Sequence, residues 1–146
     1  MVSAVQYLHS LSYAHRDIKL DNIVVSEDLE TVKFIDFGLC VDTADCDVNE
    51  KKKFCGTTSY MAPEIISGTC LEPKKADIWS LGVALYHLCV GRNPFVGKQE
   101  NEIFHKIQNS KLIFPEQLSQ SLIELLSKML KKDPHNRPSI IWIINH

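Results

Sequence analysis

The stretch "YAHRDIKLDNIVV", from Tyr13 to Val25, decides how the rest of the sequence is interpreted. It places Asp17, Lys19 and Asn22 within six residues of one another. The apolar run at residues 23–25 follows at once and is rich in β-branched side chains, so we expect a buried strand there. The pattern therefore predicts a loop that carries charged groups and is anchored by a strand.

The flanking segments predict a helix before this loop and a hairpin after it. Apolar residues recur at the spacing of an amphipathic helix at Val2, Val5, Leu8 and Leu11. A second apolar run, residues 32–35, follows the polar segment "SEDLET". We expect this run to pair with residues 23–25 in a β-hairpin.

The remainder of the chain is expected to be a loop followed by helices. Residues 40–56 show no periodicity and carry acidic residues followed by three lysines, which is typical of a long solvated loop. Asp77 is predicted to cap a buried helix over residues 78–90, which ends near Gly91. Shorter helices are expected at "NEIFHKIQ", at "LSQSLIELLSKML" and after Ser139. The predicted fold class is α+β, mainly helical with a small β-hairpin.

Composition indicates one ordinary globular domain. The chain has 146 residues, of which 45% are hydrophobic and 23% charged, and its net charge of −2 gives no general attraction to nucleic acid or membranes. Five cysteines without a C-x-x-C pair indicate reduced thiols in an intracellular protein, cytoplasmic or nuclear. The longest apolar helix candidate is too short to span a bilayer, and the first ten residues lack the features of a signal peptide.

Three short motifs occur in a specific order. The pattern H-R-D-x-x-x-x-N is matched by His15, Arg16, Asp17 and Asn22; "DFG" follows at Asp36, Phe37 and Gly38, and "APE" ends at Glu64. Taken singly, Asp17 and Asp36 also fit ordinary helix caps or turn residues. Taken in this order, with a predicted hairpin between the first two, the motifs resemble the catalytic half of the eukaryotic protein kinase family.

The resemblance implies a role for each polar residue of the motifs. Asp17 would accept the proton of the substrate hydroxyl, and Lys19 would contact the γ-phosphate of ATP. Asn22 and Asp36 would ligate Mg²⁺ through hard oxygen atoms. Gly38 would give the turn after Asp36 a backbone freedom that a Cβ would restrict.

Other residues of the resemblance are expected to hold the structure together. His15 and Phe37 would pack and form hydrogen bonds. Asp77, in "DIWSLG", would bind backbone N–H groups of the loop at residues 15–17, and Arg137, in "HNRP", would form a buried ion pair with Glu64. The simpler alternatives are a helix cap for Asp77 and a surface charge for Arg137.

The class of kinase is suggested by residues around the catalytic loop. Lys19, two residues after Asp17, and the segment "GTTSYMAPE" resemble the serine/threonine type. Thr57 would bond to Asp17 and Lys19, although it also fits a plain loop residue. The loop and helices look similar to the calcium/calmodulin-dependent kinase group.

Arg16 beside the catalytic aspartate is typical of kinases whose activation loop is ordered by a phosphate. The usual phosphorylated position, four residues before the counterpart of Thr57, is Lys53 here, and residues 44–55 contain no Ser, Thr or Tyr. One hypothesis is that the acids of "DCDVNE" partly replace a phosphate in attracting Arg16. The alternatives are a purely solvated loop and phosphorylation at Thr43.

Several elements of a complete kinase domain are absent from residues 1–146: the G-x-G-x-x-G loop, the V-A-I-K-type lysine and the partner helix with its glutamate. We therefore expect a partial domain, the C-terminal lobe, whose last helix is truncated, and an N-terminal lobe in the full-length protein. The expected function is transfer of the γ-phosphate of MgATP to Ser or Thr of protein substrates. The alternative is a truncated, catalytically weak or inactive lobe that acts as a binding module.

Overall fold

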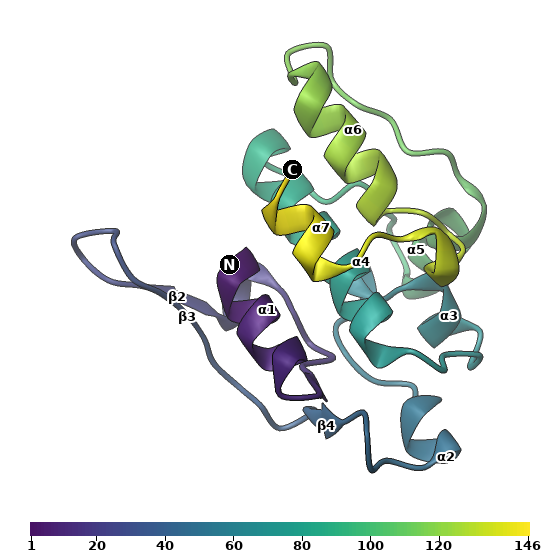
Figure 1. Ribbon diagram of the computed structural model, residues 1–146. Coiled ribbons are helices and arrows are strands. Elements are labelled where there is room, and N and C mark those ends of the chain that lie inside the picture. The colour runs from purple at the N-terminus through teal and green to yellow at the C-terminus, as the bar shows by residue number, and fades with distance from the viewer.

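A computed structural model describes residues 1–146 and confirms the α+β class. Figure 1 shows a mainly helical body from which one β-hairpin extends. The α-helices are α1 (Val2–Ser10), α2 (Val48–Lys51), α3 (Pro63–Ile66), α4 (Pro73–Val90), α5 (Glu100–Asn109), α6 (Gln120–Met129) and α7 (Ile140–Ile144). The strands are β1 (Tyr13–Ala14), β2 (Ile23–Val25), β3 (Val32–Phe34) and β4 (Val41–Asp42), and the 3-10 turns are η1 (Leu20–Asn22), η2 (Thr58–Tyr60) and η3 (Pro134–Asn136).

Helix α4 is the buried helix that the sequence predicts, but it begins earlier than expected. It starts at Pro73, whose fixed φ suits the first helical position, so the prediction that Asp77 caps it is wrong. Asp77 lies one turn further in, where its side chain is free to bind another segment. The helix ends as predicted at Gly91, which has a φ of 80° that favours glycine.

Two groups of buried side chains pack on different sides of α4. Trp79 and Val83 belong to one group, together with Phe95 and Ile107 from the segments that follow. Ile78 and Leu81 belong to the other, which also contains Val5, Ile18, Met129 and Ile143. Helices α1 and α7 contact each other beside α4, so the two ends of the chain lie close together (Figure 1). Burial of these side chains in two groups places α4 at the centre of the fold.

The β2–β3 hairpin is confirmed, with Ile23 opposite Phe34 and Val25 opposite Val32 in antiparallel register. The expectation of a buried strand is wrong for its outer part, because Val24 and Val25 are 50% and 46% exposed. The hairpin extends away from the helices, as Figure 1 shows, and no other strand of residues 1–146 pairs with it. A two-stranded sheet of this kind can bury only the face that meets the helices.

Residues 40–56 are more ordered than a solvated loop, so that prediction is wrong in part. Strand β4 pairs with β1, and α2 forms one turn further on. The Asp47 carboxylate caps α2 by accepting a hydrogen bond from the Glu50 N–H at 2.8 Å. Elements of two and four residues are too short to produce a detectable hydrophobic period.

The last three helices lie where the sequence predicts them. Leu126 and Met129 of α6 are fully buried, and Ser139 caps α7 by accepting a hydrogen bond from the Trp142 N–H. All five cysteines are free thiols, and burial raises the pKa of Cys70 to about 12. None of the helices combines the length and the apolar character needed to cross a membrane.

Candidate active site

Asp17 is the centre of a group of polar side chains that converge from two parts of the chain, the loop at residues 17–22 and Thr57. Its Oδ1 atom accepts a hydrogen bond from the Thr57 hydroxyl at 2.7 Å. Its Oδ2 atom lies 2.9 Å from the Lys19 ammonium and 3.0 Å from the Asn22 amide nitrogen. The Asp17 side chain is only 10% exposed, and the hydrogen bonds to both of its oxygens hold it in a fixed direction.

These contacts determine the protonation state of Asp17. Burial alone would raise the pKa of its carboxyl group. The hydrogen bonds from Thr57 and Lys19, the positive charge of Lys19 and the bond from Asn22 outweigh burial, and the pKa lies below its usual range. The group is therefore a carboxylate at neutral pH and can accept a proton.

Thr57 closes a triangle with Asp17 and Lys19. Its Oγ1 atom accepts a hydrogen bond from the Lys19 ammonium at 2.8 Å while donating its own proton to Asp17. Because Thr57 lies 40 residues after Asp17, this triangle joins the catalytic loop to the segment that precedes α3. The bonds that the resemblance implies for Thr57 are present.

Gly56 allows the chain to pass close to the catalytic loop. Its φ is 104°, and a Cβ added there would lie 2.7 Å from the Arg16 carbonyl oxygen. An L-residue at position 56 would therefore combine backbone strain with a clash against backbone. The next residue is Thr57, so the clash would move the hydroxyl that orients Asp17.

Replacement of Gly56 by alanine is expected to destabilise the fold by about 2 kcal/mol or more, from strain and clash together. Replacement of Gly68, which has a φ of 67° and no atom within 4 Å of an added Cβ, is the matched control. That control carries the strain alone and is expected to cost about 1 kcal/mol. Urea unfolding of both variants measures the difference, and equal losses would show that the approach to Arg16 is unimportant.

Asn22 and Asp36 lie at the open end of the hairpin. The Ile35 N–H donates to the Asn22 carbonyl at 3.0 Å, which holds the two segments together next to Asp36. The Asn22 amide nitrogen points to Asp17, so its oxygen remains for a ligand, and the Asp36 carboxylate is exposed. These two oxygen donors fit Mg²⁺, which takes few protein ligands and completes its shell with water and phosphate. No cluster of three or more His, Cys, Asp or Glu side chains is arranged to hold a metal ion.

Gly38 follows Asp36 in a turn where a Cβ would be crowded, although the glycine itself does not adopt a left-handed backbone. The residue of this turn with a left-handed backbone is Asp36, with a φ of 62°, and Gly38 has no positive φ. The Gly38 N–H donates to Asp36 Oδ1 at 3.2 Å, and an added Cβ would lie 3.2 Å from the same oxygen. The glycine therefore permits a close approach to the carboxylate, and the strained conformation is carried by Asp36 itself.

His15 and Phe37 pack together beneath the loop. The His15 ring is fully buried, with its centroid 5.0 Å from that of Phe37 and 5.4 Å from that of Phe34. Its Nδ1 atom accepts a hydrogen bond from the Asp17 backbone N–H at 3.3 Å. Phe37 is half exposed, so it covers only one side of the histidine.

Asp77 fastens the loop to the central helix. Its carboxylate accepts hydrogen bonds from the backbone N–H groups of His15 and Arg16, both at 2.8 Å. It also lies 2.9 Å from Nε2 of His9, a residue that sequence reasoning missed. No local pattern could have identified His9, because its partner lies 68 residues away on another helix.

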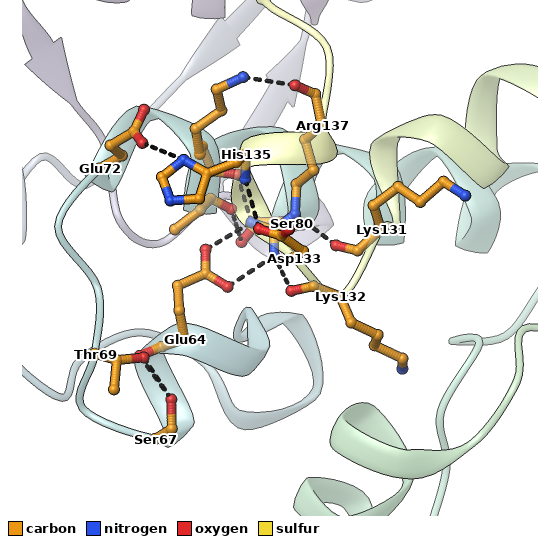
Figure 2. Close-up of polar contacts among 12 residues, drawn as sticks. Glu64, Ser67, Thr69, Glu72, Ser80, Lys131, Lys132, Asp133, His135 and Arg137 are labelled. Carbon is orange, nitrogen blue, oxygen red and sulfur yellow. Dashed lines mark hydrogen bonds and ion pairs between the residues drawn. The ribbon is translucent and has the colours of Figure 1, made fainter.

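Glu64 and Arg137 form a buried ion pair far from Asp17 in the sequence. The two guanidinium Nη atoms donate to the two carboxylate oxygens at 2.6 and 2.7 Å, as the dashed lines of Figure 2 show. Arg137 also donates to the backbone carbonyls of Lys131 and Lys75. The pair thus joins α3, α4 and the segment before α7, and its position indicates a structural function.

Arg16 adopts a left-handed backbone with a φ of 67°, and its guanidinium donates a hydrogen bond to the Glu50 carbonyl in α2. It also pairs with the carboxylate of Glu50, a residue which sequence reasoning included only as one member of an acidic run. The position of that glutamate on one turn of helix could not be derived from the charge pattern.

Comparison with known proteins agrees with this geometry. The family model described as "Protein kinase domain" matches residues 1–146. Similar proteins include maternal embryonic leucine zipper kinase of Xenopus laevis, Aurora kinase of Dictyostelium discoideum and serine/threonine-protein kinase PLK4 of Drosophila willistoni, which are 40%, 36% and 38% identical over 146 residues. Each comparison covers the whole chain but only 22%, 37% and 18% of the relative's length.

The chain thus corresponds to part of each relative, and its fold to part of a kinase domain. The resemblance to the calcium/calmodulin-dependent group is compatible with these relatives. Because the protein kinase domain model matches the whole chain and the relatives include serine/threonine kinases, this chain belongs to the protein kinase family and, within it, to the serine/threonine kinases.

Proposed function

We propose that residues 1–146 supply the catalytic and substrate-binding half of a serine/threonine kinase that uses MgATP. The observation that carries the proposal is the Asp17 carboxylate, which is ionised, almost buried and held by Thr57, Lys19 and Asn22. Such a carboxylate has a fixed direction in which to receive the proton of an acceptor hydroxyl.

In the proposed reaction the acceptor oxygen forms a bond to the γ-phosphorus of ATP, and the bond from that phosphorus to the β,γ-bridging oxygen breaks. Asp17 takes the hydroxyl proton, and ADP leaves with the bridging oxygen. Positioning dominates such a transfer because the transition state is loose and its charge is spread over oxygen atoms. Asp17 is positioned through both its oxygens and, indirectly, through Asp77, which holds the neighbouring backbone.

Lys19 supplies positive charge at the same point. Its ammonium group contacts Asp17 and Thr57, so its long side chain is already ordered. A third N–H of the ammonium remains for a phosphate oxygen. Charge that is ordered beforehand stabilises the transferred group without reorganisation during the reaction.

Asn22 and Asp36 are proposed to hold Mg²⁺, through the amide oxygen and the carboxylate. Bound there, Mg²⁺ would offset the negative charge of the nucleotide phosphates. The bond between Ile35 and Asn22 keeps the two residues at the same end of the hairpin.

Thr57 favours a short acceptor side chain. Its hydroxyl donates to Asp17 Oδ1, and a Cβ added at Gly56 would lie 3.9 Å from the same oxygen, so the backbone of residues 56 and 57 lies close to the carboxylate. A Ser or Thr hydroxyl reaches such a point from a backbone that lies near the loop, whereas a tyrosine hydroxyl requires the backbone to lie further away.

The test is a kinase assay of the full-length protein that carries residues 1–146, with matched peptides that differ only in Ser, Thr or Tyr. We expect Mg²⁺-dependent transfer to Ser and Thr at about 1–100 s⁻¹ and little transfer to Tyr. Residues 1–146 alone, which contain no G-x-G-x-x-G loop, are expected to be much slower. Substrate binding without any transfer by the full-length protein would favour the binding-module alternative.

A further inference from the structure

The Arg16 guanidinium is buried and all three of its nitrogens donate hydrogen bonds. Nε donates to the Leu39 carbonyl at 2.6 Å, and Nη1 donates to the Glu50 carbonyl at 2.8 Å. Nη2 donates to the Glu50 carboxylate at 2.5 Å. The Arg16 side chain is only 4% exposed, so its charge requires a partner within the protein.

Glu50 is the carboxylate that supplies this partner. Its side chain is about one-third exposed, which leaves the pair accessible to water on one side only. The hydrogen bond from Arg16 lowers the pKa of the Glu50 carboxyl group, in agreement with a stable pair. Lys53 approaches the same carboxylate oxygen at 3.8 Å and is the weaker of the two partners.

The pair connects two segments that both reach the active site. The Arg16 backbone N–H is held by Asp77, and the next residue is Asp17. Glu50 lies six residues before Gly56, whose backbone passes the Arg16 carbonyl, and seven before Thr57. Residues 41–43 are held separately by strand β1 and Ser12, so loss of the pair would loosen residues 48–57 and the arginine next to Asp17 together.

No side chain of residues 44–55 can carry a phosphate ester, because none is Ser, Thr or Tyr. Thr43, the nearest preceding hydroxyl, is occupied elsewhere, since its Oγ1 atom donates to the Ser12 carbonyl at 2.7 Å. Within this segment the only group that neutralises Arg16 is thus an unmodified carboxylate.

We propose that Glu50 is a positioning residue that orders residues 48–57 on Arg16 without phosphorylation, so that the active geometry is built into the unmodified chain. The inference rests on the proposed kinase function and concerns the regulation of the same site. Glu50 touches neither substrate nor nucleotide in this proposal and acts only through Arg16 and Thr57.

The experiment compares Glu50→Gln, Glu50→Asp and the matched control Asp45→Asn in the full-length protein. Asp45 is an exposed acid of the same segment without a hydrogen bond or ion pair, so Asp45→Asn changes the net charge equally. Glu50→Gln is expected to lower kcat about tenfold with little change in the KM for ATP, because a neutral amide cannot balance Arg16. Glu50→Asp is expected to restore part of kcat, and Asp45→Asn to keep it. Phosphatase treatment of the protein without substitutions is expected to leave its kinase activity unchanged.

Hydrogen exchange is the second readout and does not depend on activity. Backbone amides of residues 48–57 are expected to exchange about tenfold faster in Glu50→Gln than in Asp45→Asn. Unchanged exchange would overturn the inference. If the parent protein is active, a kcat of Glu50→Gln equal to that of Asp45→Asn, or loss of activity on phosphatase treatment, would also overturn it. A protein that is inactive in all forms but shows the exchange difference would refute the proposed function and leave the role of Glu50 in ordering the segment supported.

Discussion

Replacement of Asp17 by asparagine is expected to lower kcat about 10³-fold, within the range that a general base contributes. Asparagine has the same shape but cannot accept the proton of the acceptor hydroxyl. In the parent chain the Asp17 carboxylate accepts bonds from Thr57, Lys19 and Asn22. The amide nitrogen of asparagine is itself a donor, so it would be placed against other donors and lose at least one of these bonds. The measurement is steady-state phosphorylation of a Ser or Thr peptide by the full-length protein.

The matched control is Glu116→Gln, which removes an exposed carboxylate that has no hydrogen bond or ion pair. This control is expected to keep full activity. Thermal unfolding of both variants separates a loss of chemistry from a loss of fold. An Asp17→Asn variant that is folded and retains more than about a tenth of kcat would exclude Asp17 as the base.

Replacement of Arg137 by methionine is expected to cost about 3–5 kcal/mol of stability, because it leaves the Glu64 carboxylate buried without a partner. The guanidinium is fully buried and binds both carboxylate oxygens, so water cannot replace it. For a chain of this length such a loss lowers the melting temperature by about 10–16 °C. Thermal and urea unfolding of the chain measure it.

Two controls define the origin of this loss. Glu124→Gln breaks an exposed pair with Lys128 whose atoms are 3.0 Å apart, and it is expected to cost less than about 0.5 kcal/mol. The double variant Glu64→Gln/Arg137→Met leaves no charge at either position of the pair and is expected to be more stable than Arg137→Met. It will not recover fully, because Arg137 also binds the carbonyls of Lys131 and Lys75. If Arg137→Met unfolds like the parent chain, the ion pair has no structural importance.

Prediction succeeded where a feature depends on residues close together in the sequence. The hairpin follows from two short apolar runs and a polar turn, and the helix end at Gly91 follows from one glycine after an apolar run. The grouping of Asp17, Lys19 and Asn22 follows from their spacing in one loop. Prediction was less accurate at the start of α4, where Pro73 and not Asp77 opens the helix.

Features that depend on distant residues required the tertiary structure. The contact of His9 with Asp77 joins residues 68 positions apart, and no pattern in either segment indicates it. The exposed outer part of β2 is another case, because an apolar run shows which residues can be buried and not whether another element covers them.

The order of the motifs was enough to predict the family, which the comparisons confirm, and to predict which groups would accept a proton, bind phosphate or hold Mg²⁺. It was enough because the reacting groups are carried largely by one loop and one hairpin. Only the tertiary structure decided which acid of the segment at residues 40–56 meets Arg16. Electrostatic attraction has no preferred direction, so the charge pattern alone could not distinguish among the four acids of residues 40–56. In the structure, the helical turn of α2 brings the Glu50 carboxylate into contact with the buried Arg16 guanidinium.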